Sequence, residues 1–346
     1  MTPVELSRTV LRAVRRAVDD GELDVAVPGR TKVTPPGPGG CGDYATNVAL
    51  QLARPAGQPP LRVAEILRQH LVGADGISDV VVTGPGFLNI SLRGTDAALV
   101  REILRRGRRY GHVDRPTGQL VQLHAPHEVR AVVVMDAVAR ILRSQGALVR
   151  STCVARPDAA WTDILGAEID AYGTPEAPAP LDVNVRPVPA APADPTPLGR
   201  DAARWALLHP AAHDRPRITD HHLIQRESNP LFRVRYAHAR TRALSRNAAD
   251  LGFDAVPGDV PDGITALLAD HPRILQASAT HHAPDRLARH LVTVTDAVLP
   301  FLPTVLPRGE QKPSAAHRAR LALAEAAGTV LAGGLSLLGI DAPEHL

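Results

Sequence analysis

Two histidines close together offer the first candidate chemistry in this sequence, in the run His124-Ala125-Pro126-His127. Imidazole nitrogens bind zinc, but a zinc site needs three or four protein ligands around one point. The sequence supplies no third ligand near this pair, and Pro126 between the histidines disrupts a regular helical placement. We therefore predict no metal site in this chain.

A run of arginines is the second candidate, with five cations in nine positions: Arg101, Arg105, Arg106, Arg108 and Arg109. A guanidinium group binds phosphate through a planar fork, so this run suits contact with nucleic acid. Charge runs are more often only the solvated face of a helix. Both interpretations stay open at this point.

The composition favours several helical domains. A chain of 346 residues is long enough for two or three domains with separate cores. Aromatic residues make up only 3% of the sequence, so the cores must consist of Leu, Val, Ile and Ala, which suits helix packing. The net charge is +3, and Lys32 and Lys312 are the only lysines. This arginine bias fits a GC-rich genome as well as phosphate binding.

Cysteine usage and the first residues indicate a soluble protein of the cytoplasm. Cys41 and Cys153 have no zinc-like spacing, and two cysteines are weak support for a disulfide. Residues 1–27 contain several arginines and acids and no unbroken apolar stretch. We therefore expect neither a signal peptide nor a membrane span, and a cytoplasmic location.

The first half of the sequence predicts an α+β domain followed by a β-α-β unit. Apolar spacing and turn residues place helices at 4–18, 44–52 with Asp43 as N-cap, 62–70 and 96–110. Strands are expected at 79–83 and 87–92, joined by Gly84-Pro85-Gly86. A strand at 119–123, a helix at 128–145 and a strand at 147–154 form one β-α-β unit, the smallest element of a nucleotide-binding fold.

The second half predicts a linker and a helical bundle. Residues 156–199 contain nine prolines and little periodicity, with room for a short helix at 159–172 and a strand at 183–188. From Gly199 onward apolar stripes at helical spacing return, which predicts an all-α bundle. The expected domains are residues 1–95, 96–198 and 199–346, in a chain that is mostly helical.

Several of these segments resemble the arginyl-tRNA synthetase family, in the same order along the chain. The resemblance covers about 1–155 and 199–346 and is carried by residues 42–49, 84–90, 100–111, 199–208, 229–240 and 338–344. It implies an N-terminal additional domain that contacts the D-loop of tRNA, a remnant of a class I Rossmann-type catalytic domain, and a C-terminal DALR anticodon-binding bundle.

The features that this family uses for catalysis are missing. If His124 to His127 is the counterpart of the family's HIGH motif, Pro126 replaces the glycine and a ring projects toward the adenine position. If His124-Ala125-Pro126 instead continues a strand, the motif is deleted. No lysine loop of the KMSKS type precedes Gly199, and the region of the arginine pocket is reduced to Arg156–Leu198. We expect no catalytic residues, no aminoacylation and no ATP cofactor, because positioned cations must meet the charge of the transition state.

The resemblance also singles out residues for tRNA binding. Phe87 and Asn89 match positions of this family that contact a D-loop base. An exposed aromatic ring can stack on an unpaired base, and an amide beside it can read that base by hydrogen bonds. The alternative is that Phe87 is a core residue and Asn89 a strand-end cap. Tyr236 and Arg240, four apart, share a helix face and are expected to contact RNA, whereas His238 is expected to be packed. Two further predicted contacts lie on the basic connector, at Arg105 and Arg109.

Three functions follow from this sequence. The first is a catalytically silent paralogue that binds tRNA, with an arginine tRNA as the expected partner. The second is an enzyme, either an ATP-dependent arginine-tRNA ligase or a transferase that acts on charged tRNA. The third is a scaffold or regulator that binds protein through its helical bundle, which the low aromatic content disfavours.

Overall fold

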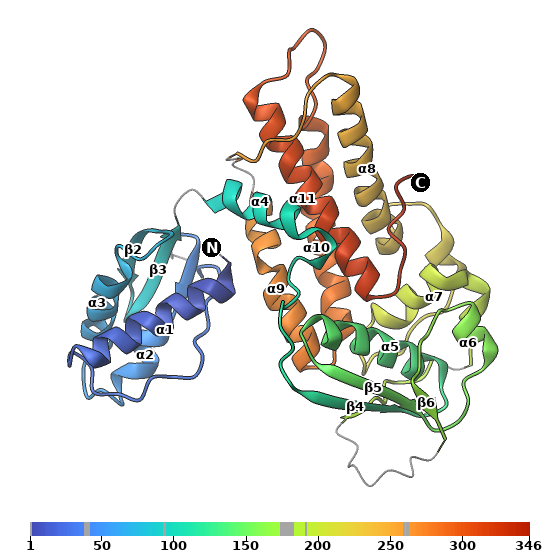
Figure 1. Ribbon diagram of the computed structural model, residues 1–346, viewed down its shortest axis with the longest axis horizontal. Helices are drawn as coiled ribbons and strands as arrows, with labels where there is room; N and C mark the ends of the chain where they lie inside the picture. Colours follow the sequence, from blue (N-terminus) through green and yellow to red (C-terminus); the bar gives the residue numbers. More distant parts are fainter. Residues whose placement is uncertain are drawn as a thin grey trace. The chain divides into compact units, whose positions relative to one another are not determined.

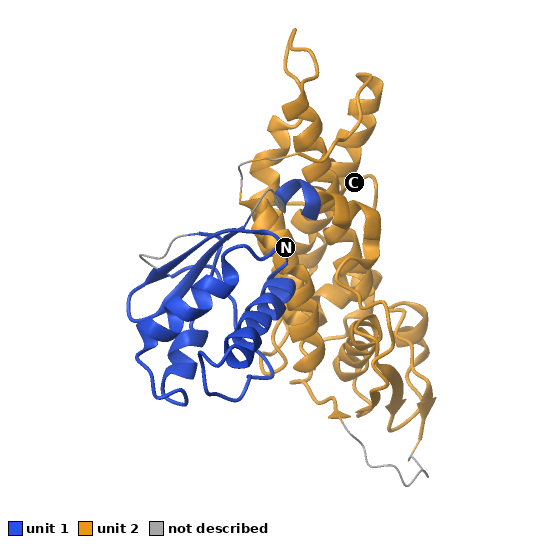
Figure 2. Ribbon diagram, turned by 60° about the vertical axis from the view of Figure 1, so that its left-hand side comes forward, with its two compact units in different colours: residues 1–99 blue, residues 100–346 orange. Residues whose placement is uncertain are grey.

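The computed structural model describes residues 2–37, 42–92, 95–173, 183–190, 192–258, 260 and 263–346. The chain folds into two compact units, residues 1–99 and 100–346, which Figure 2 colours separately. The first boundary lies close to the expected one at 95. The expected middle and C-terminal domains form a single unit. Cys41 lies outside the described residues, and Cys153 is a free, buried cysteine.

The N-terminal unit packs three helices against an antiparallel sheet of order β1-β3-β2 (Figure 1). Leu88 and Ile90 belong to its apolar core. Because side chains alternate along a strand, Phe87 and Asn89 point to the opposite face. The elements are α1 (Pro3–Asp19), β1 (Tyr44–Thr46), α2 (Val48–Ala53), α3 (Pro60–Leu71), β2 (Ile77–Thr83) and β3 (Phe87–Leu92).

One element of this unit differs from the sequence prediction. A helix was expected over 44–52, but Tyr44, Ala45 and Thr46 form strand β1, and the helix begins only at Val48. Tyr44 pairs with Ile90 across the sheet, and Thr34 bridges to Ala45 on the other side. A partner more than forty residues away decides this conformation, and local periodicity does not record such a partner. The predicted first and third helices and the hairpin are confirmed.

The C-terminal unit begins within the connector, which is the segment formed by helix α4 and the short helix η1. A parallel sheet and a helical bundle follow the connector. The sheet has the order β6-β5-β4-β7 with all neighbours parallel. Its elements and the connector are α4 (Thr95–Arg106), η1 (Gly107–Arg109), β4 (Leu120–Ala125), α5 (Val129–Ser144), β5 (Leu148–Cys153), α6 (Ala159–Asp163), β6 (Ala171–Tyr172) and β7 (Val183–Asn184).

The expected β-α-β unit is confirmed, and two short strands extend it. The expected helix over 159–172 is wrong in extent, because α6 ends at Asp163 and Ala171 and Tyr172 belong to β6. Gly166 in between has φ +62°, a conformation that ends a helix. The strand order has the pattern of a doubly wound sheet, with its reversal between β4 and β7.

The bundle contains the longest helices of the chain, and α5 packs against α7, α9 and α10. The expected fold class, an α/β remnant between an N-terminal α+β part and an all-α C-terminal bundle, is confirmed. In the described residues no helix is long and apolar enough to cross a membrane. The bundle elements are η2 (Thr196–Leu198), α7 (Gly199–Leu208), η3 (Asp220–Leu223), α8 (Pro230–Asp250), α9 (Ile264–Thr280), α10 (Pro284–Phe301), η4 (Leu302–Thr304) and α11 (Ala315–Leu337).

A buried ionic network fixes α5, α7 and the end of α11 in this unit. Asp136 on α5 contacts Arg204 on α7 at 2.5 Å, and both side chains are at most 1% exposed. Arg204 also donates to the carbonyl oxygens of Leu338 and Leu165. Gly339 has φ +70°, and a Cβ there would lie 2.4 Å from the Arg204 guanidinium carbon, so this turn requires glycine.

Candidate nucleic-acid interface

Phe87 lies at the edge of a small depression in the N-terminal unit. Its ring is 40% exposed, and the depression, of about 190 Å³, is also lined by Lys32, Thr34 and Asn47. Lys32 is exposed and has no ion-pair partner among the described residues. An aromatic ring beside a cation suits a base and its phosphate. The position of Lys32 was not predicted from the sequence, although its being one of two lysines was a signal.

Asn89 does not share this exposure. It is 2% exposed, and its amide nitrogen donates to the Thr83 hydroxyl at 2.6 Å and to the Val81 carbonyl at 3.4 Å. The side chain therefore joins β3 to β2 within the sheet. The expectation of an exposed aromatic and amide pair is corrected: of these two residues, only Phe87 is accessible to a partner.

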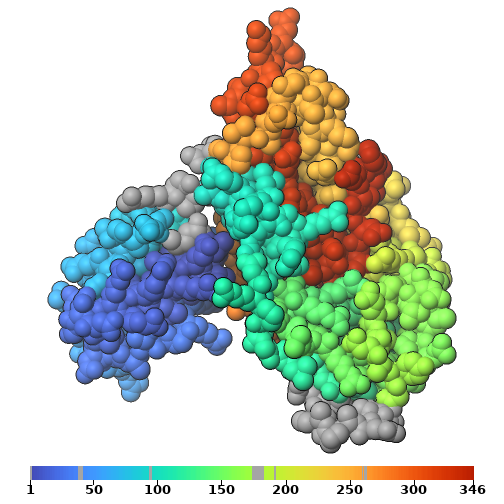
Figure 3. Space-filling model, in the orientation of Figure 1, coloured from blue at the N-terminus to red at the C-terminus, as the bar shows by residue number. Residues whose placement is uncertain are grey.

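The connector carries the basic run across the surface of the bundle, where Figure 3 shows it over α11. Arg105 is held by both oxygens of Glu102, at 2.8 and 2.7 Å, and this contact lowers the pKa of Glu102. Arg109 is exposed on η1, and within the described residues its guanidinium group has no hydrogen-bond or ion-pair partner. Of the two predicted contacts, Arg109 is thus the one left unpaired.

On α8 the predicted residues separate as their spacing requires. Tyr236 is 39% exposed and its ring stacks on that of Phe232, with centroids 5.6 Å apart. Arg240, one turn further, is exposed and unpaired in the described part of the chain. His238 is 3% exposed, its Nδ1 lies 2.9 Å from the Pro343 carbonyl oxygen, and burial lowers its pKa. The prediction that His238 is packed is confirmed.

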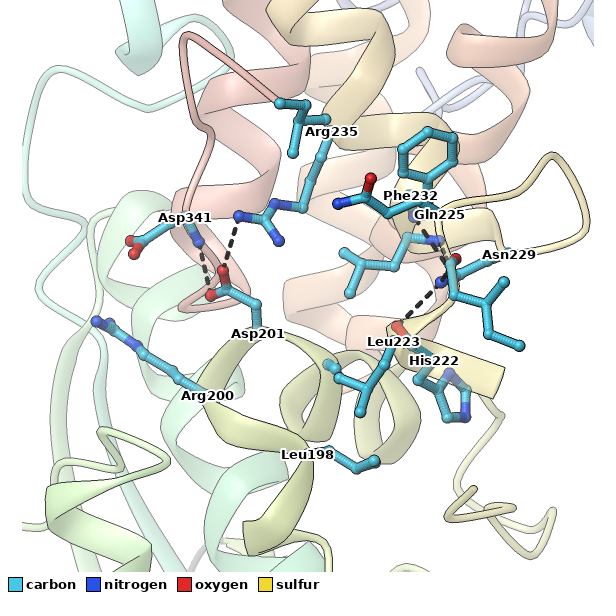
Figure 4. A pocket seen from close by; sticks show the side chains of 14 residues that line it. Leu198, Arg200, Asp201, His222, Leu223, Gln225, Asn229, Phe232, Arg235 and Asp341 are labelled. Carbon is cyan, nitrogen blue, oxygen red and sulfur yellow. Dashed lines mark hydrogen bonds and ion pairs between the residues drawn. The ribbon is translucent and has the colours of Figure 1, made fainter. Parts of the chain in front are cut away.

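A pocket of about 300 Å³ lies beside Phe232, between the starts of α7 and α8 (Figure 4). Asp201 forms its polar wall: the carboxylate accepts from the Asp341 backbone N–H at 3.1 Å and pairs with Arg235 at 3.2 Å. The buried Arg235 Nε has no hydrogen-bond partner in the described residues. Leu223 on η3 adds an exposed apolar side chain. The pocket therefore combines an unused donor with apolar walls close to the predicted RNA-binding face.

The run from His124 to His127 lies where β4 meets α5. His124 belongs to β4, is 8% exposed and lies 2.8 Å from the Thr152 hydroxyl through its Nδ1. His127 packs its ring against Trp161, 4.7 Å between centroids, and its Nε2 lies 3.0 Å from the Arg156 carbonyl oxygen. In the structure His124 and Ala125 belong to strand β4, and Pro126 follows the strand directly.

The N-terminus of α5 faces the reversal point of the sheet, which is where doubly wound folds bind phosphate. Here the Glu128 carboxylate caps the helix by accepting from the Ala131 N–H at 2.8 Å. Its second oxygen accepts from the Ala190 N–H at 3.4 Å. The Glu128 carboxylate, held by the segment at Ala190, thus takes the place at the helix N-terminus where a phosphate would bind. This role of Glu128 was not predicted from the sequence, where the residue marks only the start of a helix.

Arg130 closes the same region from the inside. It is fully buried and donates to five carbonyl oxygens, and burial lowers its pKa. These acceptors come from two segments distant in sequence, one after β7 and one that runs from the last turn of α7 into the following loop: Val188, Leu207, Pro210, Ala211 and Asp214. The guanidinium therefore ties both segments to the first turn of α5.

Family models match both ends of the chain. The arginyl tRNA synthetase N terminal domain matches residues 5–92, and the DALR anticodon binding domain matches residues 234–346. The first match covers the Phe87 depression, and the second covers most of α8 and all of α11.

Curated relatives include the arginine–tRNA ligase of Renibacterium salmoninarum, 43% identical in an alignment of 166 residues that covers 44% of this chain and 30% of the relative. The matched stretch thus spans less than a third of that relative. The arginine–tRNA ligase of Paenarthrobacter aurescens aligns over the whole of both chains, at 25% identity over 551 positions. Because this chain has 346 residues, that alignment contains long internal gaps.

Among solved structures, Thermus thermophilus arginyl-tRNA synthetase superposes with a TM-score of 0.68 at 15% identity and covers all of both chains. The arginyl-tRNA synthetase of Plasmodium falciparum gives a TM-score of 0.67 at 9% identity over 99% of each chain. At such low identities the two likenesses concern the fold.

Proposed function

This chain is related to the arginyl-tRNA synthetases, and from that premise we propose that it is a tRNA-binding protein that does not aminoacylate its tRNA. An arginine tRNA in the cytoplasm is the proposed partner. No ATP or other cofactor takes part.

The observation that carries this proposal is the N-terminus of α5. In a doubly wound fold this end must receive phosphate, and here the carboxylate of Glu128 already accepts an amide hydrogen of the first turn. A fixed negative charge at that point repels a nucleotide phosphate. The sequence contains two lysines, Lys32 in the N-terminal unit and Lys312 before α11, so the segments that build the sheet and α5 supply no lysine to balance a pyrophosphate leaving group.

The groups that face solvent support RNA binding. Three sets of aromatic or cationic side chains are exposed, and their cations are unpaired in the described residues. The sets are Phe87 with Lys32, Tyr236 with Arg240, and Arg109 by itself. Two of the three sets lie in segments that match tRNA-related family models. Stacking rings and free guanidinium groups are what a single-stranded loop of RNA requires.

A filter-binding titration tests the proposal, with an arginine tRNA transcript against an unrelated tRNA. We expect the arginine tRNA to bind at least about tenfold more tightly, with part of the preference kept between about 50 and 200 mM salt. Equal, weak binding of both tRNAs that vanishes over this salt range would reject the specific partner.

The alternative functions have their own measurements. Arginine-dependent pyrophosphate exchange above a blank without enzyme, abolished by His127→Ala, would establish a ligase and overturn the proposed lack of activity. A pull-down that recovers protein and no RNA would favour a scaffold. The full-length alignment to an arginine–tRNA ligase is the observation that keeps the ligase as the second candidate.

A further inference from the structure

A groove of about 210 Å³ lies between η1, α8 and α11 in the C-terminal unit. Of the arginine run 101–109 it includes Arg108, whereas Phe87, Arg105, Arg109, Tyr236 and Arg240 do not line it. Its polar side chains come from all three elements and from the C-terminal segment, and they include Arg108, Thr241, Arg242, Ser245, Glu325 and Glu344.

Two glycines of α11 fix the width of this groove. A Cβ at Gly333 would lie 2.7 Å from the Arg108 carbonyl oxygen, so η1 rests directly on the helix backbone. A Cβ at Gly328 would overlap the Thr241 side chain, so α8 approaches just as closely. Because both neighbours contact backbone, the groove is a fixed feature of the packing.

The floor of the groove offers a hydrogen-bond acceptor. Glu325 is partly buried, and its Oε1 accepts from the Ser245 hydroxyl at 2.8 Å. In the described residues its second carboxylate oxygen has no hydrogen-bond partner. A fixed, half-buried carboxylate oxygen selects a ligand that brings an N–H donor, because leaving such an oxygen desolvated and unpaired is costly.

Two arginines and Glu344 also line the groove. Arg108 is exposed and has no partner within the part of the chain that the structure describes. Arg242 contacts Glu344 at 3.3 Å, with side chains 45% and 54% exposed, and an ion pair so exposed is weak enough to yield to a phosphate. The unpaired Arg109 adds a cation next to Arg108 on η1.

We propose that this groove binds one unpaired nucleotide whose base carries an exocyclic amino group, with Glu325 accepting from that amino group and Arg108 and Arg242 holding the flanking phosphates. The inference rests on the proposed RNA binding and adds a base preference to it. Cytosine, adenine and guanine carry an exocyclic amino group, whereas uracil has none and offers carbonyl oxygens. The volume lies below the ~300–1,000 Å³ of a site for a drug-sized ligand, which suits a single base.

Glu325→Gln tests the base contact through the sign of its effect. If Glu325 only adds negative charge beside RNA, the variant binds RNA more tightly. If it accepts an amino group, the variant binds oligo(C) and oligo(A) of about ten nucleotides roughly tenfold more weakly, and its preference over oligo(U) disappears. We expect the second result. Tighter or unchanged binding of oligo(C) and oligo(A) overturns the proposal, and Glu310→Gln, on an exposed loop, is the control for net charge.

Arg108→Gln and Arg242→Gln test the phosphate contacts. Each variant should lower the slope of log K against log salt by about 0.7 for the same oligonucleotides, as the loss of one phosphate contact on a single strand predicts. Slopes equal to that of the wild type in both variants overturn this part of the proposal. The unfolding midpoint in urea should stay unchanged in both, since the two side chains are exposed.

The outcomes separate this inference from the function on which it rests. A wild-type chain that binds neither tRNA nor oligonucleotides rejects RNA binding itself. A wild-type chain that binds tRNA, with groove variants that bind it equally well, rejects only the groove.

Discussion

Arginine serves opposite purposes in two regions of the C-terminal unit. Inside the fold, Arg130 at the start of α5 and Arg204 on α7 are fully buried, and their guanidinium groups are used up by carbonyl oxygens and by Asp136. On η1 and α8, Arg109 and Arg240 are exposed and unpaired in the described residues. The arginines of this chain therefore occupy two environments. In one, the guanidinium group is hydrogen-bonded inside the fold; in the other, it remains free for a partner, and only burial distinguishes the two.

The largest expected effect on stability belongs to the substitution Arg204→Met, which tests the role of the buried arginines. The variant removes a fully buried cation and leaves Asp136, itself 1% exposed, with the partly exposed Arg140 and the Glu168 backbone N–H. Breaking a buried pair in this way should cost about 3–5 kcal/mol of unfolding free energy. Urea unfolding followed by circular dichroism measures the loss. Arg240→Met is the matched control, expected within about 0.5 kcal/mol of the wild type, and equal losses in both variants would contradict the comparison.

Two buried histidines should make the stability of the C-terminal unit depend on pH. His271 and His290 lie on α9 and α10, with rings 5.3 Å apart. Burial lowers the pKa of His290 to about 4 and that of His271 well below its ordinary value. Since the unfolded chain then binds protons first, stability should be complete above about pH 6.5 and fall toward pH 4, by about 3 kcal/mol for His290.

Urea unfolding at a series of pH values between these limits measures that loss. His290→Gln should reduce the dependence on pH, because a group that titrates only in the unfolded chain is removed. A wild-type chain whose unfolding free energy stays constant over this pH range would show that these histidines remain accessible to protons.

At the surface, Phe87→Ala should weaken binding of the arginine tRNA by about 1–3 kcal/mol, because one stacked base loses its platform. Filter binding measures the change. Phe253→Ala, at a residue of the C-terminal unit that is 2% exposed, should lower stability. If Phe87→Ala leaves the affinity of the folded protein unchanged, the depression beside Lys32 takes no base.

The smallest expected effect belongs to single exposed arginines. Arg240→Gln and Arg109→Gln should each weaken tRNA binding by about 1 kcal/mol at low salt and reduce the salt dependence by about one phosphate contact. Arg105→Gln is the comparison on the same connector, and its effect should be smaller because Glu102 already holds that guanidinium. A larger effect of Arg105→Gln would show that Glu102 releases it to RNA.

Local periodicity determines those parts of the fold that could be predicted from the sequence. The helix starting at Pro3, the hairpin of β2 and β3, and the unit from β4 to β5 follow from spacing and turn residues alone. Strand β1 and the two-residue strand β6 could not be predicted, because their conformation depends on neighbours distant in the chain. Strand β7 lies within the strand expected at 183–188, but it ends at Asn184.

For the candidate site the limit was burial. Phe87 and Asn89 lie two residues apart in one strand, so the sequence places both on the same face. Only the structure shows that the amide of Asn89 is hydrogen-bonded within the sheet. Tyr236 and His238 separate correctly, because helical spacing alone places them on different faces. Glu128 and Arg130 gave no signal, since their roles depend on the carbonyl and amide groups of segments roughly sixty to eighty residues away.

The parallel sheet ends on both sides in strands of two residues, Ala171–Tyr172 and Val183–Asn184. The outermost strand of any open sheet presents unpaired backbone groups that invite a second chain to pair and aggregate. Edges of only two residues present little of this template. The small sheet of this chain can therefore stay open at both edges while offering few backbone groups for a second chain to pair with.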